Sequence, residues 1–154
     1  MLNTAAFLRP TSDELSQPFW EATANRKLML QRCQVCGAFQ FPPHERCRRC
    51  LGFVTWVESA GRGALYSWTV VYRATHEVFK EWLPYNLALV RMSEGPLMCS
   101  RIVADNELDL REGLELRVDF WPIGDVSIPV FKPLGAASGA AENPEEAITE
   151  RRDA

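Results

Sequence analysis

Apolar and polar side chains alternate with a period of two over much of the chain from residue 54 onward. In residues 114–121, Leu, Leu, Val and Phe alternate with Glu, Arg, Asp and Trp. Because successive side chains of a strand point to opposite faces of a sheet, this pattern predicts strands with one buried face. After an extended segment at residues 54–59, the sequence predicts five strands, at residues 64–73, 86–92, 97–103, 114–121 and 128–132.

The segments between these strands carry turn residues. Gly61-Arg62-Gly63 predicts a turn before the first strand, and Ser93-Glu94-Gly95-Pro96 predicts the turn of a hairpin. Residues 105–110 are expected to form a short turn or helix between the third and fourth strands. Five strands with that connection favour a small closed barrel, most economically an OB-fold. The sequence therefore predicts a mainly β protein.

The N-terminal part has a different pattern. A short helix is predicted at residues 12–25, because Pro18 suits a first turn and Asn25 suits an end. Its candidate buried side is formed by Phe19, Trp20 and Thr23. At the other end of the chain, residues 135–154 are rich in Ala, Gly and Glu, which is typical of a flexible tail.

Four of the five cysteines form two C-x-x-C pairs separated by ten residues. The pairs are Cys33 with Cys36, and Cys47 with Cys50. Two tight turns that each offer two thiolates can complete a tetrahedron around Zn²⁺. Since all four positions are filled by cysteine, no ligand position is left for water or substrate. The predicted metal is therefore structural and not catalytic.

Three other uses of these cysteines are compatible with the sequence. Iron in a rubredoxin-like site takes the same ligands. Two redox-active C-x-x-C motifs would need a thioredoxin-like setting, and two disulfides would need an oxidising compartment. Gly37 and Gly52 follow the two pairs and are expected to let the backbone fold back toward the sulfur atoms.

Charge is distributed unevenly over a chain whose net charge is −3 and whose isoelectric point is near 5.5. Residues 26–50 hold six basic side chains and one acid, whereas residues 105–125 hold seven acids and two arginines. Indiscriminate binding of polyanions needs a basic surface, so the overall balance argues against it. Arg46, Arg48 and Arg49 crowd the second cysteine pair, where they are available for phosphates or acidic side chains.

Aromatic side chains in the first predicted barrel strand are candidates for interaction. By alternation, Tyr66, Trp68, Val70 and Tyr72 fall on one face. Such a stripe can stack nucleic-acid bases or anchor another protein, and it can equally pack within the core. Single-stranded nucleic-acid binding is therefore the alternative function, although the acidic barrel segment argues against it.

The sequence offers no catalytic residues. It contains no G-x-S-x-G, H-E-x-x-H or phosphate-loop motif. His76 is expected to be a solvated loop residue, and Cys99 is expected to be a buried, inert thiol within an apolar strand. No apolar run is long enough for a spanning helix and no secretory signal is evident, so we expect a cytoplasmic protein without membrane contact.

A set of motifs in fixed order resembles a known family. The helix with Phe19-Trp20 precedes residues 28–36, and Phe39-Gln40-Phe41-Pro42-Pro43 separates the cysteine pairs. Further matching motifs are Gly61-Arg62-Gly63, Tyr66-Ser67-Trp68-Thr69-Val70, Pro84-Tyr85, Ala88-Leu89-Val90 and Glu94-Gly95-Pro96. This order resembles the zinc-ribbon OB-fold proteins associated with acyl-CoA enzymes, long catalogued as a domain of unknown function. The resemblance covers about residues 16–134.

We expect an organisation in four parts: an N-terminal helical segment (1–30), a rubredoxin-like zinc ribbon (31–55), a five-stranded OB-fold barrel (56–134) and the flexible tail (135–154). The resemblance implies the first three parts. Two departures stand out. His44 occupies a stretch where family members often carry arginine, and the tail has no counterpart in the family.

The same resemblance implies a function. It implies a non-catalytic accessory subunit in a hetero-oligomer with a thiolase-like enzyme (thiolase, acyltransferase or aldolase), needed for assembly and for shaping the acyl-CoA channel. A hot-dog-fold enoyl-CoA hydratase is the second implied partner. The implied cofactors are structural Zn²⁺, held by Cys33, Cys36, Cys47 and Cys50, and a coenzyme A thioester at a shared interface. No residue of this chain is predicted to be catalytic.

Overall fold

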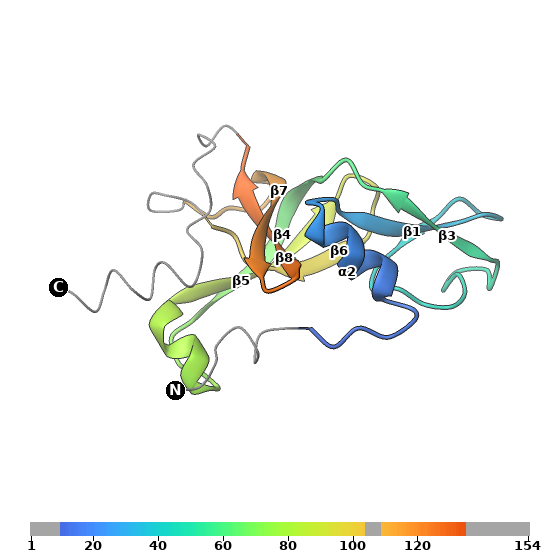
Figure 1. Cartoon of the computed structure of the whole chain (residues 1–154). Helices are drawn as coiled ribbons and strands as arrows, with labels where there is room; N and C mark the ends of the chain where they lie inside the picture. The colour runs from blue at the N-terminus through green and yellow to red at the C-terminus, as the bar shows by residue number, and fades with distance from the viewer. Residues whose placement is uncertain (1–9, 104–108, 135–154) are drawn as a thin grey trace.

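The computed structural model describes residues 10–103 and 109–134 (Figure 1). The elements are α2 (Gln17–Ala24), β1 (Met29–Cys33), β2 (Phe39–Gln40), β3 (Val54–Glu58), β4 (Arg62–Val71), the 3₁₀ helix η1 (Glu77–Trp82), β5 (Tyr85–Met92), β6 (Leu97–Ser100), β7 (Glu115–Ile123) and β8 (Val126–Pro133). The prediction of a mainly β protein with one short N-terminal helix is confirmed. The connection predicted at residues 105–110 lies largely outside the described residues, and the predicted tail lies wholly outside them.

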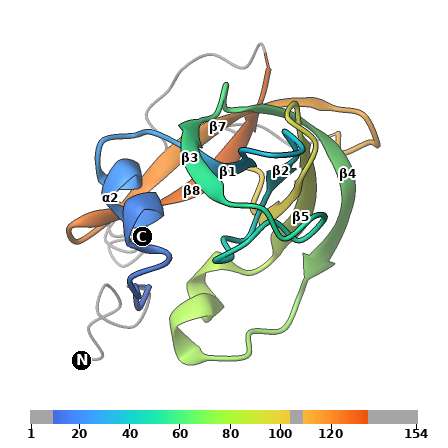
Figure 2. The ribbon, with the colours of Figure 1, turned by 90° about the vertical axis from the view of Figure 1, so that its right-hand side faces the viewer.

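The strands form two antiparallel sheets. The smaller sheet has the order β2-β1-β3, and the larger has the order β6-β5-β4-β7-β8. The larger sheet curls round as in Figure 2, and all five of its strands overlap the predicted ones. The smaller sheet extends away from it (Figure 1). The five-stranded prediction is confirmed, in the form of a curled half-barrel.

The edge strands β6 and β8 meet through a short bridge. The Phe131 N–H and carbonyl each form a 2.8 Å hydrogen bond with the backbone on either side of Ile102. The Asn86 side chain binds the N–H and the carbonyl of Ile102, at 2.7 and 2.8 Å. Because these partners satisfy the backbone, the strand predicted at residues 97–103 ends at Ser100.

The start of β4 differs from the predicted turn. Of Gly61-Arg62-Gly63, only Gly61 has the left-handed conformation of a turn, with φ of 66°. Gly63 already pairs with Met92 of β5, and a Cβ there would lie 2.6 Å from the Arg91 carbonyl oxygen. Glycine is therefore needed at this position for the close approach of two strands and not for a turn.

Helix α2 is shorter than the predicted range 12–25. The Ser16 N–H donates to the Asp13 carboxylate at 2.8 Å, and the Asp13 N–H donates to the Ser16 hydroxyl at 3.1 Å. This closed turn precedes the helix and keeps the Ser16 side chain from capping it. Pro18 lies in the first turn and Asn25 ends the helix, both as predicted.

One hydrophobic core is shared by the helix, the smaller sheet and the half-barrel. Its fully buried members include Leu30 of β1 and Leu65, Val90 and Phe131 of the larger sheet, with Phe19 of α2 packed among them. The base of the smaller sheet is therefore packed onto the half-barrel, and the two sheets cannot move independently without exposing apolar surface.

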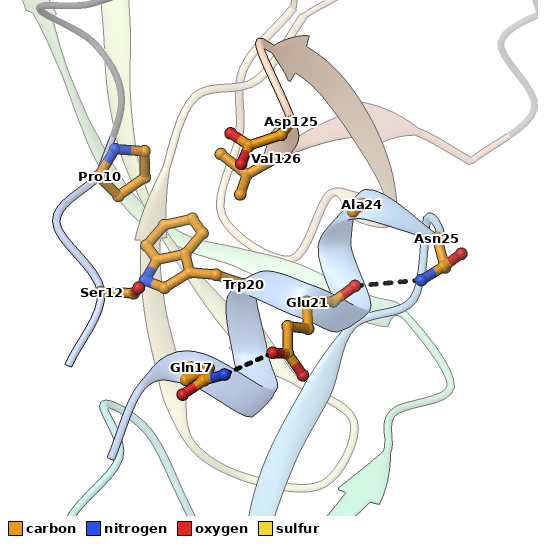
Figure 3. A pocket seen from close by; sticks show the side chains of 9 residues that line it. All are labelled: Pro10, Ser12, Gln17, Trp20, Glu21, Ala24, Asn25, Asp125 and Val126. Carbon is orange, nitrogen blue, oxygen red and sulfur yellow. Dashed lines mark hydrogen bonds between the residues drawn. The ribbon is translucent and has the colours of Figure 1, made fainter. Parts of the chain in front are cut away.

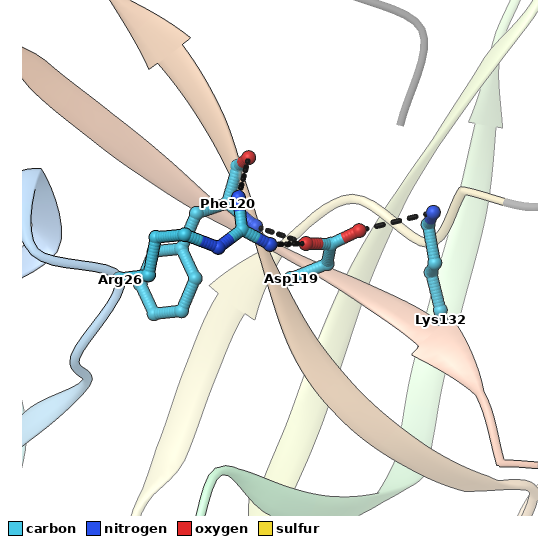
Figure 4. A network of polar contacts seen from close by, with 4 residues as sticks. All are labelled: Arg26, Asp119, Phe120 and Lys132. Atoms are coloured by element: carbon cyan, nitrogen blue, oxygen red, sulfur yellow. Dashed lines mark hydrogen bonds and ion pairs between the residues drawn. The ribbon is translucent and has the colours of Figure 1, made fainter. Parts of the chain in front are cut away.

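A partly buried ionic network reinforces this junction (Figure 4). The Asp119 carboxylate of β7 binds the Arg26 guanidinium at 2.5 Å and the Lys132 ammonium at 3.0 Å. The Lys132 side chain is only 4% exposed. Burial alone would raise the pKa of Asp119, but hydrogen bonds from Lys132, the Phe120 N–H and Arg26 lower it overall. The network ties the α2–β1 connection to β7 and β8.

Candidate metal centre

Two knuckles of the same geometry present the four cysteines. In the first, the Cys33 carbonyl accepts the Gly37 N–H at 3.1 Å, and the Cys33 N–H donates to the Ala38 carbonyl at 2.9 Å. In the second, the Cys47 carbonyl accepts the Leu51 N–H and the Cys47 N–H donates to the Gly52 carbonyl, both at 2.9 Å. The turns predicted from the C-x-x-C spacing therefore form twice.

The four sulfur atoms converge on one point. All Sγ atoms of Cys33, Cys36, Cys47 and Cys50 lie within 4.8 Å of one another. The pair Cys33–Cys50 is separated by 3.4 Å and the pair Cys36–Cys47 by 3.7 Å. Tetrahedral coordination with Zn–S bonds of 2.3 Å requires sulfur–sulfur edges of about 3.8 Å. The donor set and its spacing thus fit a four-coordinate Zn²⁺.

Backbone N–H groups tune the thiols. Hydrogen bonds from the Cys36 and Val35 N–H groups lower the pKa of Cys33 to about 6, and the Arg49 N–H similarly lowers the pKa of Cys47. The Gly52 N–H acts in the same direction on Cys50, but the neighbouring thiols outweigh it and raise the pKa of Cys50 to about 12. The thiolate form of Cys33 is therefore favoured, while deprotonation of Cys50 needs a cation among the sulfurs.

The glycines after the two pairs have different roles, contrary to the prediction. Gly37 is left-handed, with φ of 71°, as expected for the end of a knuckle. In the second knuckle the left-handed residue is Leu51, with φ of 61°, and not Gly52. A Cβ on Gly52 would lie 2.7 Å from Val35 Cγ2 and 3.2 Å from the Cys33 sulfur, so this glycine serves close packing.

Two buried glutamines hold the second knuckle in place. Gln31 and Gln40 are paired in the β1–β2 ladder, and the Gln40 amide donates to the Gln31 side chain at 2.8 Å. Gln40 also accepts the Arg48 N–H at 2.9 Å and donates to the Arg46 carbonyl at 3.2 Å. Neither residue was predicted from the sequence. Their only signal is a polar side chain at an otherwise buried strand position.

An exposed apolar surface lies beside the cysteines. Val35, Leu51 and Phe53, which we call the ribbon tip, are 73%, 76% and 62% exposed. The Arg46 guanidinium lies 3.8 Å from the centre of the Phe53 ring. Arg46, Arg48 and Arg49 are exposed, as predicted. The apolar residues among them were missed, although they lie within and directly after the cysteine pairs.

The predicted aromatic stripe on β4 is split between two faces of the sheet. A bulge between Leu65 and Ser67 shifts the register by one residue. Trp68 pairs with Ala88 and therefore shares the face of the core, where it is 38% exposed. Tyr66 lies on the opposite face, with the guanidinium of Arg91 4.6 Å from its ring centre. Alternation in the sequence could not reveal the bulge, so the prediction of one common face is wrong.

The other candidate residues do not gather into a site. Cys99 is exposed and not buried, because Met98 takes the inward position in β6 and Cys99 alternates outward. His44 is exposed, and its backbone N–H donates to the Gln31 side chain at 2.9 Å. Within the described residues, the cysteine quartet is the one cluster of potential metal ligands.

A pocket of about 390 Å³ lies between α2 and the β7–β8 turn (Figure 3). Trp20 and Val126 line its two sides. Gln17 donates to the Glu21 carboxylate at 2.6 Å, and Asn25 donates to the Glu21 carbonyl at 3.2 Å. These polar groups bind one another and do not converge on the cavity, so the pocket shows no arrangement for chemistry.

No helix in the part of the chain described here is long and apolar enough to cross a bilayer.

A four-cysteine ribbon packed on a curled five-stranded sheet defines a zinc-ribbon OB-fold protein. Two family models match the chain: the "ChsH2, rubredoxin-like zinc ribbon domain" at residues 20–55 and the "ChsH2, C-terminal OB-fold domain" at residues 56–120. A "DUF35 domain-containing scaffold protein" of Methanothermobacter thermautotrophicus is 31% identical over 91 residues, which cover 58% of this chain and 68% of that protein. The chain belongs to the DUF35 family, as the resemblance implied.

Two further similarities concern named assemblies. A solved structure described as "Ltp2-ChsH2(DUF35) aldolase" has a TM-score of 0.71 and 30% identity, covering 81% of this chain and 98% of the matched one. The "Probable enoyl-CoA hydratase alpha subunit" of Thermomonospora curvata is 35% identical over 120 residues. These are 75% of this chain but only 36% of that protein, so the chain spans about a third of this relative.

Proposed function

We propose that this chain is a non-catalytic accessory subunit of an acyl-CoA enzyme complex. The observation that carries the proposal is the 98% coverage of the DUF35 chain in the Ltp2–ChsH2 aldolase, at a TM-score of 0.71. The chemistry would then reside in the partner subunit.

The proposed metal is a structural Zn²⁺ held by the thiolates of Cys33, Cys36, Cys47 and Cys50. The converging sulfur atoms and the full complement of cysteine ligands support this proposal. When bound, the ion would supply folding free energy to the ribbon and no open coordination position. Elemental analysis of the purified protein should give one zinc per chain, whereas a coloured protein with iron would contradict the choice of metal.

The proposed partner is a thiolase-like enzyme, with a hot-dog-fold hydratase as the second candidate. The aldolase assembly favours the first, and the hydratase alpha subunit similar to this chain favours the second. In either complex, we propose that the chain contributes to the binding of a coenzyme A thioester at a shared interface.

The proposed division of the chain is an N-terminal segment (1–30), the zinc ribbon (31–55), the OB-fold (56–134) and the tail (135–154).

The ribbon tip is proposed as one contact with the partner. Val35, Leu51 and Phe53 expose apolar surface on the most basic part of the chain, which favours a partner surface with an apolar centre and acidic rim. Phe53→Ser should weaken the complex at least tenfold. The protein should stay folded, because the Phe53 side chain is 62% exposed. Leu134→Ser, at an exposed position outside the tip, is the matched control.

Co-expression with the neighbouring reading frames, followed by affinity purification, tests the function. A stoichiometric thiolase-like or hydratase chain in the eluate is the expected result. A solitary monomer with no copurifying chain, or turnover of an acyl thioester by this chain alone, would contradict the proposal. Tighter binding of single-stranded oligonucleotides than of any copurifying chain would favour the nucleic-acid alternative instead.

A further inference from the structure

Arg101 lies among aromatic rings of η1 and the half-barrel. The segment η1 lies at the end of the half-barrel away from β1 and β3 (Figure 1). The guanidinium carbon of Arg101 is 5.0 Å from the ring centre of Trp82, 5.2 Å from that of Tyr85 and 4.8 Å from that of Trp121. The rings of Trp82 and Trp121 contact each other edge to face at 5.8 Å. These four side chains, supplied by η1, β5, β7 and the residue after β6, are called the Arg101 cluster below.

The Arg101 cluster contains hydrogen-bond donors that lack acceptors. Arg101 Nε, Arg101 Nη1 and the indole Nε1 of Trp121 are buried, and none has a hydrogen-bond partner within the described residues. Asp119, the carboxylate two positions before Trp121 in β7, is already bound by Arg26 and Lys132. Within the same residues, Arg101 forms no ion pair, and its partly buried charge lies against three aromatic rings.

The aromatic rings stabilise the charge of Arg101 but do not accept hydrogen bonds from its N–H groups. Aromatic faces attract a cation that lies above them, whereas the N–H groups of guanidinium lie in its own plane and need acceptor oxygens. Burial lowers the pKa of Arg101 to about 10, which still leaves it protonated at neutral pH. Buried donors without acceptors cost free energy, and charged donors cost most. The cluster is therefore incomplete without an anionic acceptor.

We propose that the Arg101 cluster is a binding site for a single carboxylate. Its oxygens would accept the free N–H groups of Arg101 and Trp121, and its one negative charge would match the one positive charge between apolar walls. A phosphate monoester would bring about two charges into the same space and leave one unpaired. The carboxylate could belong to a small organic acid or to an Asp or Glu side chain of a bound protein. This site is independent of the proposed function.

Titration of the ¹⁵N-labelled full chain with sodium acetate tests the proposal. Acetate should shift the Arg101 Nε–H and Trp121 indole N–H resonances downfield together and to saturation, at constant ionic strength. Arg101→Gln should weaken acetate binding at least tenfold, as followed at the Trp121 resonance, while Arg101→Lys should retain part of it. Arg91→Gln is the matched control, because Arg91 also lies over an aromatic ring but has an exposed side chain.

Several outcomes would overturn the proposal. They are the absence of any shift, an equal shift with sodium chloride, a stronger response to inorganic phosphate than to acetate, and an Arg101 Nε–H that is already hydrogen-bonded in acetate-free buffer. Repeating the titration on the complex with a copurified partner distinguishes the sources. Loss of the acetate response there identifies a carboxylate of the partner, and a retained response identifies a free acid. If no partner copurifies, the acetate result still stands.

Discussion

At the scale of single residues, the second knuckle contains an energetic conflict. Leu51 has the left-handed conformation that costs an L-residue about 1–2 kcal/mol, and its side chain is 76% exposed. The matching position of the first knuckle is Gly37. A strained and exposed apolar residue gains nothing from burial in the isolated chain, which agrees with a role of the ribbon tip in binding.

Replacing Leu51 by glycine should therefore stabilise the isolated protein. The relief of backbone strain exceeds the added entropy of the unfolded chain, so we expect the free energy of unfolding to rise by about 1 kcal/mol. Chemical denaturation of the metal-loaded protein measures this. Gly37→Leu should change the free energy by a similar amount in the opposite direction. A less stable Leu51→Gly protein would show that the leucine side chain makes contacts within the fold.

A second prediction concerns Gln40, which binds both the backbone of the second knuckle and the Gln31 side chain. Groups that orient metal ligands typically contribute 10–100-fold to metal affinity. Gln40→Ala should weaken zinc binding by about that factor, as measured by competition with a chelator of known affinity. Gln34→Ala, at an exposed position between Cys33 and Cys36, should leave the affinity unchanged. Equal affinities for both variants would remove Gln40 from this role.

At the scale of elements, the network around Asp119 joins α2 and β1 to β7 and β8. Asp119→Asn removes the carboxylate that binds the Lys132 ammonium, whose side chain is 4% exposed. Breaking a buried ion pair in this way costs about 3 kcal/mol. Asp119→Asn should lower the free energy of unfolding by that amount at pH 7. Glu58→Gln, which breaks an exposed pair with Lys27, should cost less than about 1 kcal/mol.

The same network predicts a dependence on pH. Because the folded protein lowers the pKa of Asp119, this carboxylate stabilises the fold at pH values above the unfolded pKa of about 3.9. The contribution is lost as pH falls through the lower pKa of the folded state. The difference in stability between the wild type and Asp119→Asn should therefore shrink below about pH 4. A difference that stays constant between pH 7 and pH 2 would contradict an ionic role.

At the scale of the whole molecule, the shared core links the metal to the rest of the fold. Leu28 and Leu30, which lead into the first knuckle, are buried together with Leu65 and Phe131 of the half-barrel. Cys36→Ser should abolish zinc retention and complex assembly, and it should also lower the melting temperature of the half-barrel. Metal analysis, copurification and circular dichroism follow these effects. Cys99→Ser removes an exposed thiol outside the quartet and should preserve all three properties.

Assembly of Cys36→Ser without metal would show that the ribbon needs no ion.

Zinc binding should also release protons, because the pKa of Cys50 is raised to about 12 in the metal-free quartet and its thiol must ionise. Acidification should therefore weaken zinc binding. A zinc affinity that is independent of pH would contradict ligation by these thiols.

Much of the architecture could be predicted because it follows from local rules. The period of two predicted all five strands of the half-barrel, and the C-x-x-C spacing predicted the clustering of four thiols. The errors arose where tertiary contacts decide. Tyr66 and Trp68 alternate in sequence, but the bulge between them separates their faces. Gln40 and Arg101 gained their roles from tertiary contacts, Gln40 with the second knuckle and Arg101 with rings of η1, β5 and β7, and alternation along the chain does not reveal such contacts.

The bulge in β4 determines which faces of the sheet carry the aromatic side chains of this strand. With Tyr66 directed to the convex side and Trp68 to the concave side, a stretch of three residues offers an aromatic ring in two opposite directions. A regularly paired strand would have placed both rings side by side, facing a single neighbour. Partly exposed aromatic rings therefore lie on both faces of the same strand, only two residues apart.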